Sequence, residues 1–124
     1  CLLPKDPDLS AQGLYTNLQA QLGFAVPIVI SDSFGRPWRE GIVNVAIGCC
    51  GFDPFTDYRG QADSAGRALK VTRMASADAL ASGAELACGK LKRAPFVIVR
   101  GFNWQPSTLT AQALLRPEEK NFFP

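Results

Sequence analysis

Two adjacent patterns near the start of this 124-residue chain constrain its fold most: a leucine repeat and a β-branched run. Leu14, Leu18 and Leu22 recur every four residues, which predicts a helix with one apolar face at residues 6–23. The run AVPIVISD follows directly at residues 25–32 and predicts a buried strand. A helix followed at once by a strand points to a fold that mixes both.

The rest of the chain continues this mixed pattern. Two glycines and a proline predict a loop at residues 33–41, and a composition rich in Gly, Pro and Asp predicts a long loop at residues 49–66. Alanine-rich sequence predicts a second helix at residues 74–88, ended by Gly89. Further strands are expected at residues 42–48, 68–72 and 95–101, and Asp8 or Ser10 is expected to cap the first helix.

These elements predict an α+β (mixed α/β) fold in a single compact domain covering residues 1–124. We expect a mixed sheet of about three to five strands with two main helices. Residues 1–24 form a helical lead-in, residues 25–101 form the core, and residues 102–124 form a tail.

Composition excludes several classes of site. The chain has no histidine, which removes Ser-His-Asp and Cys-His catalysis and imidazole-ligated zinc. A net charge of +2 is low for a nucleic-acid binder, so no nucleic-acid partner is expected. The four cysteines contain no C-x-x-C pair, which favours reduced thiols in a cytoplasmic protein. The longest apolar run is too short to cross a membrane. A start at Cys1 instead of Met indicates a processed or cut chain.

Asp32 is the strongest candidate for chemistry from the residues alone. It ends the predicted strand and opens a loop, where α/β folds place their ligands. Ser33 adds a hydroxyl, and Arg36 and Arg39 add cations suited to phosphate or carboxylate. A magnesium or manganese ion would suit Asp32 and Ser33, and Arg36 is the candidate catalytic residue. The alternative is that Asp32 only caps the loop.

Three other groups of residues each allow two interpretations. The charged residues of the long loop could bind a polar substrate or form a solvated ion-pair surface, the interpretation we favour. The basic turn after the second helix could steer a polyphosphate or complement the helix dipole. Phe102 and Trp104 could stack on a base, although packing is commoner. The loop residues are Asp53, Asp57, Arg59, Asp63 and Arg67, and the cations of the turn are Lys90, Lys92 and Arg93.

Several of these segments resemble the coenzyme F420-0:L-glutamate ligase (F420 γ-glutamyl ligase) family. The longest matching stretches are ISDSFGRPWR at residues 30–39 and GRALKVT at residues 66–72. VAIG at residues 45–48, DYRGQ at residues 57–61 and VIVRG at residues 97–101 occur in the family's order. Shorter matches are Ala77-Asp78 and Gly89-Lys90, and the tail resembles the family at residues 110–119.

The resemblance implies a GTP- and divalent-metal-dependent amide ligase that adds L-glutamate to the deazaflavin precursor F420-0 through an acyl phosphate. It assigns metal contacts to Asp32 and Ser33, with manganese or magnesium as the metal. It also implies a homodimer. The family's nucleotide segment maps onto consecutive residues, which are Cys88, Gly89, Lys90, Leu91, Lys92, Arg93, Ala94 and Pro95.

The chain departs from the family in length and in charge. It corresponds to the C-terminal half of the ligase domain, so activity is expected to need the N-terminal half, from a homo-oligomer or a partner chain. Lys90 stands where some members have a metal ligand, and a protonated lysine cannot ligate a cation. The alternative is a non-catalytic binding or assembly domain of the same fold.

Overall fold

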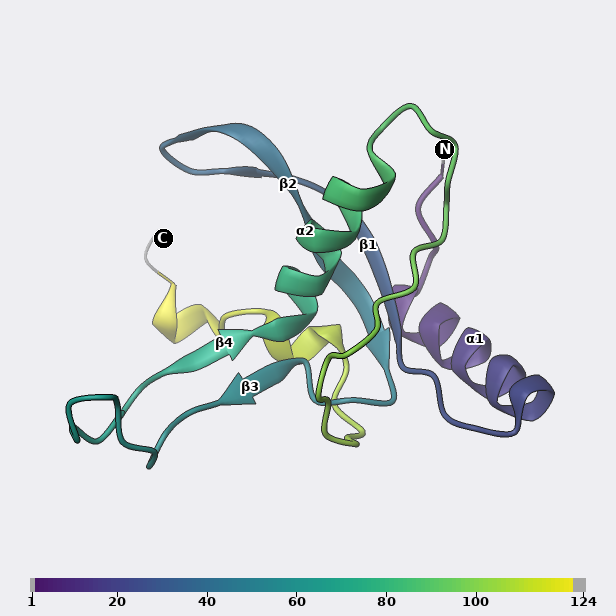
Figure 1. Cartoon of the computed structure of the whole chain (residues 1–124). Coiled ribbons are helices and arrows are strands. Elements are labelled where there is room, and N and C mark those ends of the chain that lie inside the picture. The colour runs from purple at the N-terminus through teal and green to yellow at the C-terminus, as the bar shows by residue number, and fades with distance from the viewer. Residues whose placement is uncertain (1, 122–124) are drawn as a thin grey trace.

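A long β-hairpin between two helices organises the fold (Figure 1). The computed structural model describes residues 2–121. The hairpin strands β1 and β2 pair antiparallel, and a shorter antiparallel pair, β3 and β4, precedes the second helix. The elements in chain order are α1 (Pro7–Leu22), β1 (Ile28–Arg36), β2 (Arg39–Cys50), β3 (Phe55–Asp57), β4 (Arg73–Ala75), α2 (Ser76–Cys88) and the 3-10 turns η1 (Ala111–Leu114) and η2 (Glu118–Lys120).

The first helix forms as the leucine spacing predicts, but a different residue caps it. The Asp6 carboxylate accepts the Leu9 N–H at 2.9 Å, so the cap is Asp6 and neither Asp8 nor Ser10. The helix ends at Gly23, whose φ of 77° lies in the left-handed region that glycine adopts without strain. Asp8 is therefore available for contacts with other elements.

The predicted loop at residues 33–41 is wrong, because those residues form the outer half of the hairpin. β1 continues to Arg36, and only Pro37 and Trp38 lie between the strands, with Trp38 at a φ of 55°. Register shifts beside Ile30 and Gly35 accommodate irregularities in the pairing. Turn-forming residues are tolerated here because both strands are edges of a two-stranded arm.

The two helices pack on opposite faces of this hairpin. Gly48 faces α1 so closely that an added Cβ would lie 2.4 Å from the Pro7 carbonyl oxygen. Ala46 and Cys49 lie on the other face and pack with Ala77 of α2. Gly48 and Cys49 therefore face different helices, and the register shift at Ile47 returns Ala46 to the face of Cys49.

The hydrophobic core lies between β2, α2 and the C-terminal tail. Its buried members are Cys49, Phe52, Ala77 and Ala111, and the partly buried Phe102 and Trp104 pack against them. The rings of Phe52 and Phe102 meet edge to face, with centroids 6.4 Å apart. The aromatic residues of the tail therefore contribute to packing.

The α+β class is confirmed, while the strands are divided between two separate two-stranded sheets instead of joining one mixed sheet. The strand expected at residues 68–72 is wrong: there Ala68 forms only an isolated bridge with Ala62, and β4 begins after it, at Arg73–Ala75. The strand expected at residues 95–101 is wrong as well, because within residues 2–121 that segment has no backbone hydrogen bond to a neighbouring strand. Within the same range, no helix is both long and apolar enough to cross a membrane.

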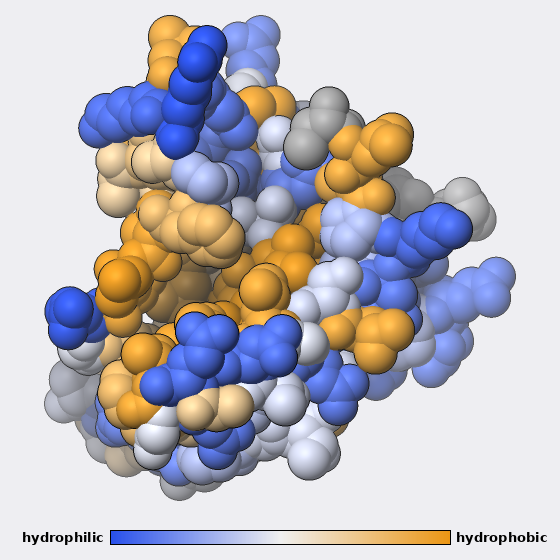
Figure 2. All heavy atoms as spheres, turned by 90° about the vertical axis from the view of Figure 1, so that its right-hand side faces the viewer, coloured by the Kyte–Doolittle hydropathy of each residue, from blue (hydrophilic) through white to orange (hydrophobic). Residues whose placement is uncertain are grey.

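Many large apolar side chains remain at the surface. Phe96 and Ile98 are 80% and 78% exposed, and Trp38 at the hairpin turn is 84% exposed. Figure 2 shows hydrophobic residues, in orange, gathered around a hollow on the face seen from the right of Figure 1. The described residues thus leave apolar surface uncovered on more than one element.

Candidate functional site

A polar cluster joins the hairpin to the C-terminal end of α2. The Lys90 ammonium donates to the Asn44 side-chain oxygen at 3.2 Å and forms an ion pair with Glu85 at 2.5 Å. The Ser82 hydroxyl donates to the Asn44 carbonyl at 2.7 Å. Asn44 is the register partner of Ser33. The fold therefore brings two of the predicted site segments, residues 32–36 and residues 88–95, to one end of the molecule.

Asp32 lies in the middle of β1, opposite Val45, and not at a strand end as expected. Its side chain is half-buried, and no hydrogen bond or ion pair of its carboxylate is found within residues 2–121. Successive side chains of a strand point to opposite faces, so Asp32 faces the α1 side while Ser33 faces Asn44 and α2. A single ion held by both side chains is therefore not favoured by the strand geometry.

The described residues do not form a complete metal site. No group of three or more His, Cys, Asp or Glu side chains with metal-binding geometry occurs among residues 2–121. The Asp32 carboxylate, half-buried and without a hydrogen-bond partner among these residues, is chemically suited to be one ligand of a hard cation. Further carboxylate ligands of such a site would have to come from outside these residues.

Arg36 closes the outer end of β1. Its terminal Nη2 donates to the Glu40 carbonyl at 2.9 Å across the turn. The Nε of the same guanidinium is buried and has no hydrogen-bond partner among the described residues. A buried donor without a partner costs free energy, so Arg36 keeps one donor group available for a ligand.

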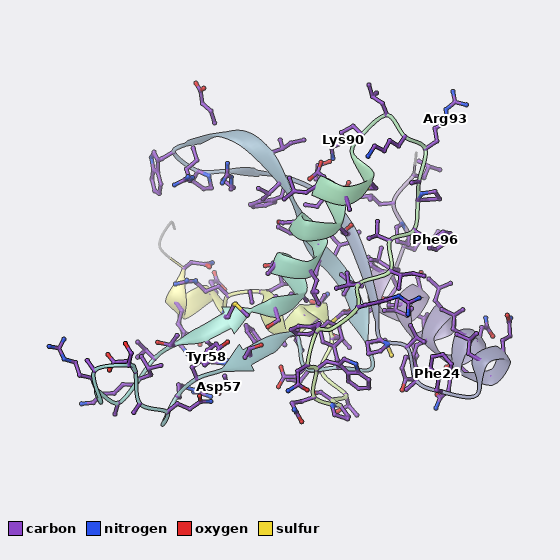
Figure 3. The ribbon with its side chains drawn as sticks, viewed as in Figure 1. Phe24, Asp57, Tyr58, Lys90, Arg93 and Phe96 are labelled. Atoms are coloured by element: carbon purple, nitrogen blue, oxygen red, sulfur yellow. The ribbon has the colours of Figure 1, made fainter. Side chains whose placement is uncertain are left out.

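The basic segment at residues 88–95 begins at the end of α2. Gly89 ends the helix and its N–H donates to the Glu85 carbonyl at 2.7 Å. The Lys92 ammonium turns back and donates to the Ala87 carbonyl at 3.2 Å. These contacts are those expected of cations at a helix C-terminus, where they satisfy free carbonyls. Arg93, at a φ of 52°, lies farther along the loop (Figure 3).

The charged residues of the long loop lie elsewhere. Asp57 and Tyr58 are at the opposite end of the molecule from Lys90 and Arg93 (Figure 3). Asp57 forms an ion pair with Arg59. The hydrogen bonds that the side chain and backbone of Arg59 donate lower the pKa of the Asp57 carboxyl to about 2. An exposed pair of this kind is the solvated ion-pair surface we favoured from the sequence.

Two polar residues were not recognised from the sequence. Asn44 is the only polar side chain in the stretch IVNVAIG at residues 42–48, and that isolated polar position was the available signal. Asp78, in the first turn of α2, accepts the Ala46 N–H at 2.9 Å beside the register shift in β2. Together they fix both ends of α2 against the hairpin.

Cys49, Cys50 and Cys88 are free thiols, as expected, while Cys1 lies outside the described residues. Burial raises the pKa of the Cys49 thiol to about 12, and nearby acidic groups such as Asp8 add to the effect. Cys49 is therefore a packing residue and not a nucleophile.

Comparison with known proteins connects this geometry to a family. A family model described as F420-0:Gamma-glutamyl ligase matches residues 1–101. Coenzyme F420:L-glutamate ligase of Methanothermobacter thermautotrophicus is 44% identical over 124 residues. The proteins with the same name from Methanocaldococcus jannaschii and Methanococcus maripaludis are 41% and 36% identical.

These alignments cover 98% of this chain but only 49% of each of the three relatives. The chain thus spans about half the length of the curated relatives that it matches. The match includes every segment that the polar cluster brings together, from Ser33 through Asn44 to Lys90.

Proposed function

Because the chain belongs to the F420-0:Gamma-glutamyl ligase family, we propose that it forms half of a ligase that joins L-glutamate to F420-0. The relatives' printed name, coenzyme F420:L-glutamate ligase, supports the substrate class. The other half of the ligase domain would come from a partner chain, from a second copy or from further sequence. The proposed substrates are F420-0, L-glutamate and GTP, and the proposed location is the cytoplasm.

The observation that carries the proposal is the contact of Lys90 with Asn44, next to Ser33. It places the basic segment at residues 88–95 beside the hairpin that carries Asp32 and Arg36. Cations at that position can hold the phosphates of GTP, and the unpartnered Arg36 Nε can donate to a phosphate or carboxylate oxygen.

The proposed reaction proceeds in two steps. A carboxylate of the deazaflavin substrate attacks the terminal phosphorus of GTP, which forms an acyl phosphate and releases GDP. The glutamate amine then attacks the acyl carbon, phosphate leaves, and the amine proton passes to solvent. The described residues would bind and orient these groups: Lys92 and Arg93 toward phosphates, and Arg36 toward the carboxylate that reacts.

A divalent manganese or magnesium ion, with Asp32 as one ligand, would neutralise negative charge on the phosphoryl oxygens. Ser33 remains a second proposed contact, although it lies on the other face of β1. Lys90 takes part in an ion pair with Glu85 and is assigned to the phosphates instead of a second metal.

Reconstitution tests this proposal. The chain is mixed with the half of the Methanothermobacter relative that it does not match, and glutamate addition to F420-0 is followed by mass spectrometry with GTP and manganese. We expect ligation with the unchanged chain, its loss with Asp32→Ala, and its retention with Glu118→Ala, an exposed acidic control in η2. Ligation at the unchanged rate by Asp32→Ala would remove Asp32 from the site.

One observation favours a second candidate function. Residues 2–121 hold no group of three metal-ligating side chains, which a non-catalytic binding or assembly domain would not need. Titration calorimetry with GTP, with and without manganese, separates the two. Manganese-dependent GTP binding that Lys90→Met weakens supports the ligase. A folded mixture that neither binds GTP nor ligates supports the assembly domain.

A further inference from the structure

Residues 96–100 belong to no helix or strand of the structure, but their side chains have the exposure pattern of a β-strand. The exposure of successive side chains alternates: Phe96 and Ile98 are 80% and 78% exposed, whereas Val97 and Val99 are 37% and 50% exposed. This period of two is that of an extended strand with one face toward the protein. Yet no backbone hydrogen bond of residues 96–100 is found within residues 2–121. Both edges of the segment are therefore open to pairing.

A groove runs beside this segment. Its volume is about 530 Å³, and α2 forms one wall while residues 97–102 form the other. Leu80, Ala84 and Ala87 contribute from the helix, and the segment contributes residues 97–99. Arg100 is the only charged residue in the lining, and no acidic residue takes part. The groove is thus suited to apolar side chains next to an extended backbone.

We propose that an apolar β-strand from the other half of the ligase domain docks here by pairing with residues 96–100. Its main-chain groups would satisfy the open edge, and its inward side chains would fill the groove beside α2. This inference rests on the proposed function, because it assigns the place where the second half attaches.

The length of the relatives and the charge of the groove indicate which strand docks there. The relatives carry about as many residues again as this chain, which is enough sequence to supply a strand that covers the segment. A second copy, pairing its own residues 96–100, would bring Arg93 and Arg100 of both copies into one interface. The groove offers no acidic side chain to balance those four cations. By contrast, a strand of the other half that is followed by an acidic residue would bring a negative charge to Arg100.

Amide hydrogen exchange tests the pairing directly. The chain is measured by NMR alone and after mixing with the unmatched half of the Methanothermobacter relative. We expect exchange to slow at alternate amides among residues 96–100, because strand pairing along one edge engages every second N–H. A complex in which these amides exchange as in the free chain would overturn the proposal. Failure of the two halves to form a complex would overturn it as well.

A pair of variants tests the groove. Ile98→Asp places a charge in the proposed interface, and Val71→Asp places the same charge on an equally β-branched side chain, 87% exposed, outside the groove. We expect the dissociation constant of the two halves to rise at least tenfold for Ile98→Asp and to change less than twofold for Val71→Asp. Circular dichroism checks that both variants keep the fold, and equal effects of the two would refute the docking site.

The outcome is separable from that of the proposed function. Slowed exchange at residues 96–100 in a mixture that does not ligate glutamate would support the docking strand and contradict the activity. Ligation by a mixture whose residues 96–100 stay unprotected would support the activity and overturn the strand. Protection that appears in the free chain as its concentration rises, with dimers in sedimentation, would assign the groove to a second copy and overturn the proposed occupant.

Discussion

Replacing Asp8 should destabilise this chain more than any other single change of an acidic side chain. One oxygen of the Asp8 carboxylate accepts the Cys49 N–H at 2.9 Å and the Ala111 N–H at 3.0 Å. Those contacts join α1 to β2 and to η1, which is 103 residues away in sequence. Asp8→Ala leaves two N–H groups without a partner beside the core.

The magnitude follows from the number and kind of bonds. A hydrogen bond to a charged group contributes about 1.5–3 kcal/mol, and the half-buried position of Asp8 reduces that, so we expect a loss of about 2–4 kcal/mol from the two bonds together. Asp6→Ala is the matched control, because Asp6 caps the same helix from an exposed position. That change should cost about 1 kcal/mol. Urea unfolding, followed by circular dichroism, measures both.

The pH dependence has a defined sign. Burial opposes ionisation of Asp8, but hydrogen bonds from Cys49 and Ala111 outweigh it and lower the pKa of the carboxyl from its ordinary value of 3.8. The stabilisation is therefore complete above that value and is lost as the pH falls through the lower pKa of the folded chain. Asp8→Asn should thus approach the unchanged chain in stability toward pH 2. Equal losses for Asp8→Ala and Asp6→Ala at pH 7 would refute this reasoning.

Three further changes test the packing of the same elements. Gly48→Ala puts a Cβ 2.4 Å from the Pro7 carbonyl oxygen, and because backbone has to move we expect a loss of about 1–3 kcal/mol in urea unfolding. Asp78→Ala removes the acceptor of the Ala46 N–H and should cost about 1–3 kcal/mol, with a smaller loss for Asp78→Asn. Cys49 should stay unlabelled by iodoacetamide at pH 8 in the native chain, as seen by peptide mass spectrometry, because burial raises the pKa of its thiol to about 12.

Local patterns in the sequence predicted the elements that depend on neighbouring residues. The leucine spacing predicted α1, and glycine at position 23 marked its end, since both effects act within one or two turns of helix. The alanine-rich stretch likewise predicted α2 to within two residues of its start. The strand predicted at residues 95–101 does not form among the described residues, because no sequence pattern states whether a partner strand is present.

Long-range pairing was not predictable in the same way. Gly35 and Gly41 favour a loop locally, but pairing of β1 with β2 extends the hairpin through them. β3 and β4 have three residues each and are too short to show a periodic pattern in the sequence. They form because the intervening loop brings residues 73–75 back alongside residues 55–57, where the two segments pair antiparallel. The contact of Lys90 with Asn44 spans 46 residues, so the sequence could name Lys90 but not the strand that it would meet.

The small core explains why so few carboxylates fix so much of this fold. Of the apolar side chains buried within residues 2–121, Phe52 alone is large, and the others are alanines, Cys49 and Pro54. Apolar burial on this scale stabilises the elements weakly, so hydrogen bonds that Asp8 and Asp78 accept from backbone N–H groups have to set where the helices lie on the hairpin. The large apolar side chains stay exposed on the outer hairpin and on residues 96–100 instead. The Lys90–Asn44 cluster lies at that end of α2 and β2, so a second half that covered those surfaces would also enclose the proposed site.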